Sequence, residues 1–185
     1  QVIPINAQIG KEDVEVYWDD CIRSNCSIDD LSKLKPVVKA DGIVTAGNSS
    51  PMNDGASAVM IMSEQKALSL GLKPIAVVKE YATIGCDPNY MGMGPVLATK
   101  KLFDKTGYSM KDMDLIEINE AFASQSIACL KEMGLYNTRD MKRVNVNGGA
   151  IAIGHPNSAS GGILIARLIY ELRKRNLNRG LITFC

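Results

Sequence analysis

The most informative stretch of this chain is Gly148-Gly149-Ala150-Ile151-Ala152-Ile153-Gly154-His155-Pro156, which holds its only histidine. A second apolar stretch, Leu181-Ile182-Thr183-Phe184-Cys185, ends on a thiol. Both are typical of buried strands, each with a reactive residue at its far end. Since the carboxyl ends of parallel strands meet at one sheet edge, His155 and Cys185 are predicted to form a proton-transfer site there.

Strand-like and helix-like segments alternate along the chain. The patterns predict strands at 56–62, 74–82, 114–118, 143–153 and 180–185, and helices at 64–70, 95–106, 121–133 and 159–175. Residues 1–40 are polar and indicate a loop or subdomain tail, in which Ser27 and Asp30 resemble a helix N-cap. The alternation predicts an α/β layered fold with right-handed crossovers.

The helix expected around 163–172 is apolar on almost its whole circumference, so it should be buried on all sides. A single sheet would cover one side only, and the strand at 56–62 has no sheet of its own. We therefore expect a missing half or a tight oligomer. The chain also begins at Gln1 and stops at Cys185 without a capping turn, which predicts a fragment of a longer protein.

The bulk composition excludes several classes of function. With 185 residues, 46% of them hydrophobic, the chain can form one or two globular domains. The net charge of +1 favours neither nucleic acid nor a membrane as partner. No signal peptide is visible, and Arg167 interrupts a helix that is too short to span a bilayer.

The cysteines indicate neither a metal site nor a disulfide framework. They are odd in number, lack C-x-x-C spacing and have no histidine nearby: Cys21, Cys26, Cys86, Cys129 and Cys185. We therefore expect no metal and a reducing compartment, the cytoplasm or an organelle matrix.

Three polar residues follow predicted strands and are the candidate site: Asn119, His155 and Cys185. Each has a purely structural alternative. Asn119 could be a helix N-cap, His155 a hydrogen-bonded structural histidine and Cys185 a buried small hydrophobe. Met91 and Met93 are more typical of core than of pocket lining.

Four motifs occur in order along residues 40 to 185: Ala46-Gly47-Asn48-Ser49-Ser50 with Asn53-Asp54-Gly55-Ala56, then Met91-Gly92-Met93-Gly94-Pro95, then Asn119-Glu120-Ala121-Phe122-Ala123, and finally the glycine-rich stretch ending in His155-Pro156. Together they resemble the thiolases, and acetyl-CoA acetyltransferases in particular. The resemblance implies a layered αβαβα fold. In that fold 1–41 would be the loop-domain tail, 42–72 the last strand and helix of the amino-terminal core domain, and 73–185 the carboxyl-terminal core domain, truncated after Cys185.

The same resemblance assigns roles to individual residues. His155 would lower the pKa of a nucleophilic cysteine and, with a water held by Asn119, form an oxyanion hole. Cys185 would be the acid/base cysteine. Ser50 would lie along the pantetheine arm of CoA, and Met91 and Phe122 would border the acyl pocket.

The implied activity is reversible thiolysis of acetoacetyl-CoA, or Claisen condensation of two acetyl-CoA, within fatty acid metabolism. CoA would be a substrate, with no resident cofactor. The expected partners are acyl-CoA, the missing amino-terminal half and further copies of the chain, with neither nucleic acid nor a membrane among them.

Three departures from the thiolase pattern favour an inactive chain. The nucleophilic cysteine and the glycine-rich segment after Cys185 are absent, and Asn157 and Ser158 replace an aliphatic residue and a glycine. If residue 158 needed a positive φ, serine would cost about 1 kcal/mol and displace His155. The alternative is therefore a non-catalytic, degenerate thiolase-like interaction module. A decarboxylating ketoacyl synthase fits poorly, since it would need a second histidine at position 185.

Overall fold

A parallel pair of strands lies at the centre of the carboxyl-terminal part of the molecule. The computed structural model describes residues 3–185. Strand β3 (Leu115–Ile118) pairs in parallel with β4 (Gly180–Thr183), with Ile116 opposite Leu181. Val144 adds a single parallel bridge to Ile116 on the other side of β3. The strands predicted at 114–118 and 180–185 are therefore confirmed.

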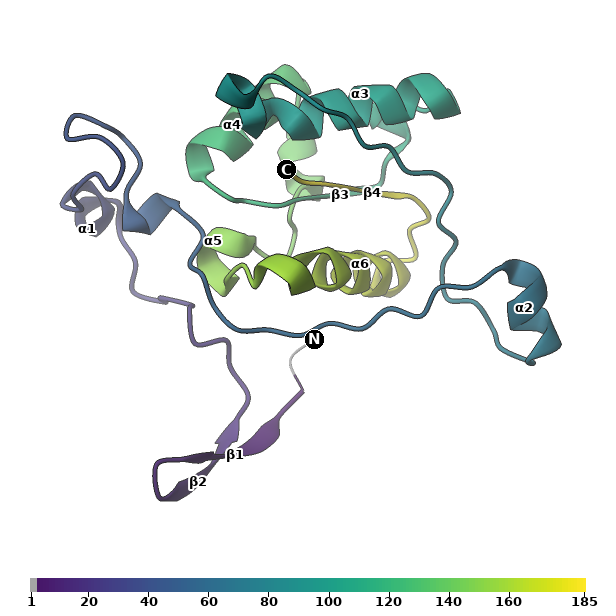
Figure 1. Cartoon of the computed structure of the whole chain (residues 1–185), viewed down its shortest axis with the longest axis horizontal. Coiled ribbons are helices and arrows are strands. Elements are labelled where there is room, and N and C mark those ends of the chain that lie inside the picture. Colours follow the sequence, from purple (N-terminus) through teal and green to yellow (C-terminus); the bar gives the residue numbers. More distant parts are fainter. Residues whose placement is uncertain (1–2) are drawn as a thin grey trace.

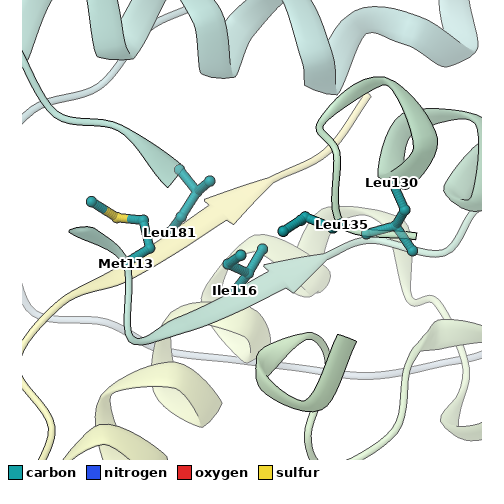
Figure 2. Close-up of a cluster of buried hydrophobic side chains, with 5 residues drawn as sticks. All are labelled: Met113, Ile116, Leu130, Leu135 and Leu181. Carbon is teal, nitrogen blue, oxygen red and sulfur yellow. The ribbon is translucent and has the colours of Figure 1, made fainter. Parts of the chain in front are cut away.

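Helices cover both faces of this strand pair (Figure 1). Helices α3 (Gly94–Thr106) and α4 (Ala123–Glu132) lie on one face, and α6 (Asn157–Lys174) lies on the other. Figure 2 shows the apolar cluster between the strands and the α3–α4 layer, made of Met113, Ile116, Leu130, Leu135 and Leu181. The layered α/β arrangement is as predicted.

Helices α3, α4 and α6 lie where the sequence patterns predicted helices, at 95–106, 121–133 and 159–175. Helix α3 has Pro95 in its first turn and ends at Gly107, whose φ of +72° is left-handed. Among residues 3–185 no helix is long and apolar enough to cross a membrane.

The strand predicted at 143–153 is wrong. Residues Arg139–Arg143 form a 3₁₀ turn, only Val144 bridges to β3, and Ala150–Ile153 form the one-turn helix α5. The backbone at Asn145, Gly148 and Gly154 has positive φ values, which extended strands do not adopt. His155 therefore follows a helical turn rather than a strand.

The strands predicted at 56–62 and 74–82 are also wrong. Both segments are extended but have no strand partner in the part of the chain that the structure describes. Residues 56–62 instead run along α6, where the Ser57 hydroxyl donates to the Ala159 carbonyl over 2.7 Å. Much of this segment is exposed, including 81% of Met60. An apolar pattern alone cannot supply the neighbouring strand that a sheet requires.

The amino-terminal part consists of short elements on extended chain. Strands β1 (Ile5–Ile9) and β2 (Glu12–Val16) form an antiparallel hairpin, which the sequence interpretation missed. Helix α1 (Ile28–Ser32) begins at the expected N-cap, Ser27. The remaining elements are 3₁₀ turns at Ala46–Asn48, Pro88–Met93 and Met110–Asp112, and helix α2 (Glu64–Ser69), which Gly71 follows with a φ of +66°.

Helix α6 is not the uniformly apolar helix that we expected. Its most buried side chains include the charged residues Arg167 and Glu171 beside Leu164 and Leu168. Tyr170 on the far side is 57% exposed. The helix thus lies between the strand pair and the extended 51–62 segment, and its buried face is partly ionic.

Candidate functional site

Asn119 lies at the carboxyl end of β3 and faces α6. Its backbone N–H donates to the Thr183 carbonyl over 3.1 Å, and its side chain is buried. It borders a cavity of about 20 Å³ that is also lined by Gly154, Ser160 and Arg167. This volume suits about one water molecule, and the site offers polar partners for it. Helix α4 begins four residues later, at Ala123, so Asn119 is not the N-cap of that helix.

His155 lies between α5 and α6, next to this cavity. Its Nδ1 is 2.7 Å from the Ser160 hydroxyl, in the first turns of α6. Its backbone N–H donates to the Pro51 carbonyl over 3.1 Å. The Ser160 contact occupies one ring nitrogen and leaves Nε2 for chemistry. Ser160 also lines the cavity beside Asn119, so His155 is linked to that cavity through its contact with Ser160.

The loop at 46–56 closes over the His155 turn. A Cβ at Gly154 would lie 2.5 Å from the Asn53 side-chain oxygen, and a Cβ at Gly55 would lie 2.5 Å from Pro156. Gly154 also has a φ of +99°. The contact between these two motifs thus requires glycine on both sides.

Cys185 lies just beyond β4, at the same end of the strand pair as α5 and the start of α6 (Figure 1). Its side chain is directed toward the other face. Thr183, two residues earlier, donates to the Pro95 carbonyl in α3, and a Cβ at Gly94 would lie 3.5 Å from the Cys185 Cβ. The neighbouring Phe184 packs toward Gly161 in α6.

The surroundings of Cys185 favour its protonated form. The residue as a whole is exposed, but its sulfur is partly enclosed by protein, and this burial raises the pKa of the Cys185 thiol. Burial also raises the pKa of Cys129, whose thiol donates to the Gly92 carbonyl over 3.1 Å.

The three substrate-binding candidates occupy neighbouring loops. The backbone N–H and hydroxyl of Ser50 both donate to the Ala121 carbonyl, over 3.0 and 3.2 Å. Ser49 forms an antiparallel bridge with Phe122. Phe122 is exposed, as is Met91 in the turn before α3. Ser50 and Phe122 therefore belong to one loop contact.

The expected strain at Ser158 is absent. Asn157 and Ser158 are the first two residues of α6, and neither has a positive φ. The helix simply begins earlier than predicted, so right-handed helical backbone accommodates serine without the penalty considered for position 158.

A buried ionic pair behind the site was missed from the sequence. Glu117 points to the α6 side of β3, where its Oε2 lies 3.9 Å from the Arg167 guanidinium and accepts no hydrogen bond. Burial raises the pKa of the Glu117 carboxyl. Arg167 also donates to the Gly148 carbonyl. The signal for this pair was the single arginine in an otherwise apolar helical stretch.

No metal centre is visible among residues 3–185: they contain no group of three or more acidic, cysteine or histidine side chains arranged to hold an ion.

Family models identify both parts of this chain. The model described as "Thiolase, C-terminal domain" matches residues 72–185, and the model described as "Thiolase, N-terminal domain" matches residues 1–65. The chain belongs to the thiolase family. This thiolase chain is 47% identical over 186 aligned residues to an acetyl-CoA acetyltransferase of Chromobacterium violaceum, covering 100% of the chain and 46% of the relative. It is 50% identical over 167 residues to the acetyl-CoA acetyltransferase of Pseudomonas aeruginosa, covering 90% of this chain and 42% of that relative.

Solved thiolase structures have the same fold. The acetyl-CoA acetyltransferase of Bacillus anthracis superimposes with a TM-score of 0.91 at 40% identity, over 100% of this chain and 46% of that one. Human mitochondrial 3-ketoacyl-CoA thiolase in complex with CoA superimposes with a TM-score of 0.88 at 43% identity, over 98% of this chain and 44% of that one. This thiolase chain therefore spans about half the length of the relatives that it matches.

Proposed function

We propose that this chain forms part of an acetyl-CoA acetyltransferase, which cleaves acetoacetyl-CoA with CoA or condenses two acetyl-CoA molecules. The observation that carries the proposal is a water-sized cavity bordered by Asn119 and Ser160, with the His155 imidazole 2.7 Å from the Ser160 hydroxyl, at the sheet end where Cys185 also lies. The acetyltransferases of similar sequence support it.

In this proposal His155 and Asn119 form an oxyanion hole. Nε2 of His155 would donate to the thioester oxygen, and a water in the Asn119 cavity would supply the second donor. The contact between Nδ1 and Ser160 supports this role because it orients the imidazole ring. His155 would also lower the pKa of the nucleophilic cysteine, which we place outside this chain.

Cys185 would transfer the proton. In condensation its thiolate removes the α-proton of acetyl-CoA, and the carbanion attacks the acyl group on the nucleophilic cysteine. In cleavage its thiol protonates the departing acetyl-CoA carbanion and then takes the proton of the attacking CoA thiol. The raised pKa of Cys185 supports the acid role, because the group is protonated at neutral pH.

CoA would be a substrate rather than a resident cofactor. A related human mitochondrial thiolase was solved in complex with CoA. We place Ser50 along the pantetheine arm and Met91 and Phe122 at the acyl pocket. The loop contact between Ser50 and Ala121, next to Phe122, supports a shared surface for the two ends of an acyl-CoA.

The chain on its own would be inactive. None of Cys21, Cys26, Cys86 and Cys129 lies in the sequence context of the expected nucleophile. We expect the activity to need the remaining half of the thiolase fold, in a homo-oligomer. Radiolabelled acetyl-CoA should leave no stable label on the purified chain, whereas label on Cys86 or Cys129 would point to a relocated nucleophile.

A chimera tests the catalytic proposal directly. The chain replaces the segment that it matches in the Chromobacterium violaceum relative, and the unaltered relative is the control. We expect the chimera to cleave acetoacetyl-CoA. Cys185→Ser should lower kcat by about 10²- to 10⁴-fold with little change in KM, since acid/base groups act mainly in the transition state.

Two results would contradict the proposal. A folded but inactive chimera would favour the non-catalytic module. A chimera whose turnover is unchanged by Cys185→Ser would remove Cys185 from the mechanism.

A further inference from the structure

The residue after Asn119 reaches across to the segment that leads to His155. The Glu120 carboxylate accepts two hydrogen bonds from that segment. One comes from the Asn145 side-chain amide over 3.0 Å, and the other from the backbone N–H of Ile151 over 3.3 Å. Glu120 therefore ties the end of β3 to the first turn of α5.

Asn145 also bonds to the backbone of β3, in the way that a residue of a neighbouring strand would. Its side-chain oxygen accepts from the Ile118 N–H over 2.8 Å, and its amide donates to the Ile118 carbonyl over 2.9 Å. Its own backbone N–H donates to Ile116 over 2.9 Å. The φ of +43° at Asn145 turns the chain away from β3 and toward Glu120.

The fit around the Glu120 carboxylate is close. A Cβ at Gly149 would lie 2.0 Å from the carboxylate carbon. The φ of Gly149 is −131°, which any residue can adopt, so the Glu120 carboxylate is the group that a larger residue at this position would displace. The neighbouring Gly148 carbonyl accepts from Arg167.

The connection from Glu120 to His155 is short. Ile151 belongs to α5, a single helical turn, and Gly154 and His155 follow directly. Asn119 and His155 are thus joined by one peptide bond, one hydrogen bond to Ile151 and four further residues. A shift of the α5 turn would move the imidazole relative to the Asn119 cavity.

We propose that Glu120 is a positioning residue, which sets the placement of His155 relative to Asn119 by holding the Gly149–Ile151 turn. Its effect on catalysis rests on the proposed function, whereas its effect on His155 does not. Glutamine at 120 would keep one acceptor but turn a donor toward either Asn145 or Ile151, so one of the two bonds would be lost.

The first test uses the imidazole resonances of this chain, in which His155 is the only histidine. The variants are Glu120→Gln, Gly149→Ala and the double variant, with Glu132→Gln as the matched control on the exposed end of α4. Alanine at 149 should push the carboxylate aside without changing its charge. We expect both single variants to shift the His155 ring nitrogen signals, and the control to leave them unchanged.

The second test measures kcat and KM of the same variants in the chimera. We expect each single variant to lower kcat by about 10- to 100-fold, with little change in KM, because misplaced catalytic groups cost rate rather than binding. The double variant should be no worse than either single one, since both break the same connection.

Several results would overturn the proposal. Unchanged His155 signals in Glu120→Gln would do so, as would lower thermal stability with normal signals and kcat, because that pattern indicates a purely structural role. Losses that multiply in the double variant would show two independent effects. If the chimera is inactive without any substitution, the proposed function fails, and the His155 signals still decide whether Glu120 positions the ring.

Discussion

Residues 88–185 and residues 3–87 differ in how they bury apolar surface. The carboxyl-terminal region encloses its own core, in which Ile116 is 1% exposed. The amino-terminal region leaves large apolar side chains in contact with solvent, and Ile61 is 72% exposed. Both are rich in apolar residues, so composition does not separate them. The difference is a sheet with helices on both faces, which only the carboxyl-terminal region possesses.

The two regions meet at the candidate site. The loop at 46–56 contacts the Gly154–Pro156 turn, and the following segment runs along α6. The less compact region thus shapes the surroundings of His155, although it contributes little to the core. Substitutions in each region, and at the contact between them, measure how much each contributes to stability.

The largest effect is expected in the core of the carboxyl-terminal region. Ile116→Ala should lower the free energy of unfolding by about 2–5 kcal/mol, because it leaves a cavity among Leu130, Leu135 and Leu181. Ile61→Ala, in the exposed segment, should change it by no more than about 0.5 kcal/mol. Urea titration measures both, and equal losses would show that the two regions share one core.

The next largest loss of stability is expected at the contact between the 46–56 loop and the Gly154–Pro156 turn. Gly154→Ala should cost about 1–3 kcal/mol, since it combines a positive φ with a Cβ 2.5 Å from Asn53. Gly85→Ala is the control, because a Cβ there meets nothing within 4 Å. Thermal unfolding compares them, and a Gly154 variant as stable as the control would mean that the loop is not held against the turn.

A smaller effect should follow from releasing the segment along α6. Ser57→Ala removes the hydrogen bond to Ala159 and should cost about 0.5–1.5 kcal/mol. Ser69→Ala, which loses a local hydrogen bond within α2, is the control. Limited proteolysis within residues 51–62 should become faster in the Ser57 variant only. An unchanged cleavage rate there would indicate that Ser57 does not anchor the segment.

The smallest effect concerns pH and the buried Glu117. Burial raises its pKa above the ordinary value of 4.5, so its contribution to stability is lost as pH rises above 4.5, where the unfolded chain ionises first. Glu117→Gln should therefore become more stable relative to the native chain as pH rises above 4.5. Urea midpoints across pH test this, with Glu132→Gln as control. If the stability of Glu117→Gln relative to the native chain fell as pH rises, that result would contradict the raised pKa of Glu117.

The pKa of Glu171, in α6, is shifted in the opposite direction to that of Glu117. Hydrogen bonds from Asn147 and Arg175 lower the pKa of its carboxyl, so its stabilising contribution is present above 4.5 and is lost as pH falls. Glu171→Gln should accordingly lose its disadvantage toward acidic pH in the same titration.

Local patterns predicted the elements whose structure depends on nearby residues. The helices at 95–106, 121–133 and 159–175 and the strands at 114–118 and 180–185 were correct within a few residues. Their periodicity and their Gly and Pro signals act over a few residues, so no distant contact is needed to identify them. The thiolase motifs likewise identified the family from sequence.

Features that depend on distant partners could not be predicted from local patterns. Residues 56–62 have the composition of a strand but lie along α6, and 143–153 turn into α5 because Asn145 and Glu120 hold that segment at the end of β3. Which face Cys185 occupies follows from the pairing of β3 with β4, and the contact of Arg167 with Glu117 follows from the packing of α6 against β3. Local sequence establishes which segments are apolar and which residues are reactive. Packing decided which of them meet, since a strand edge, a cavity and an ion pair each require a partner far away in the chain.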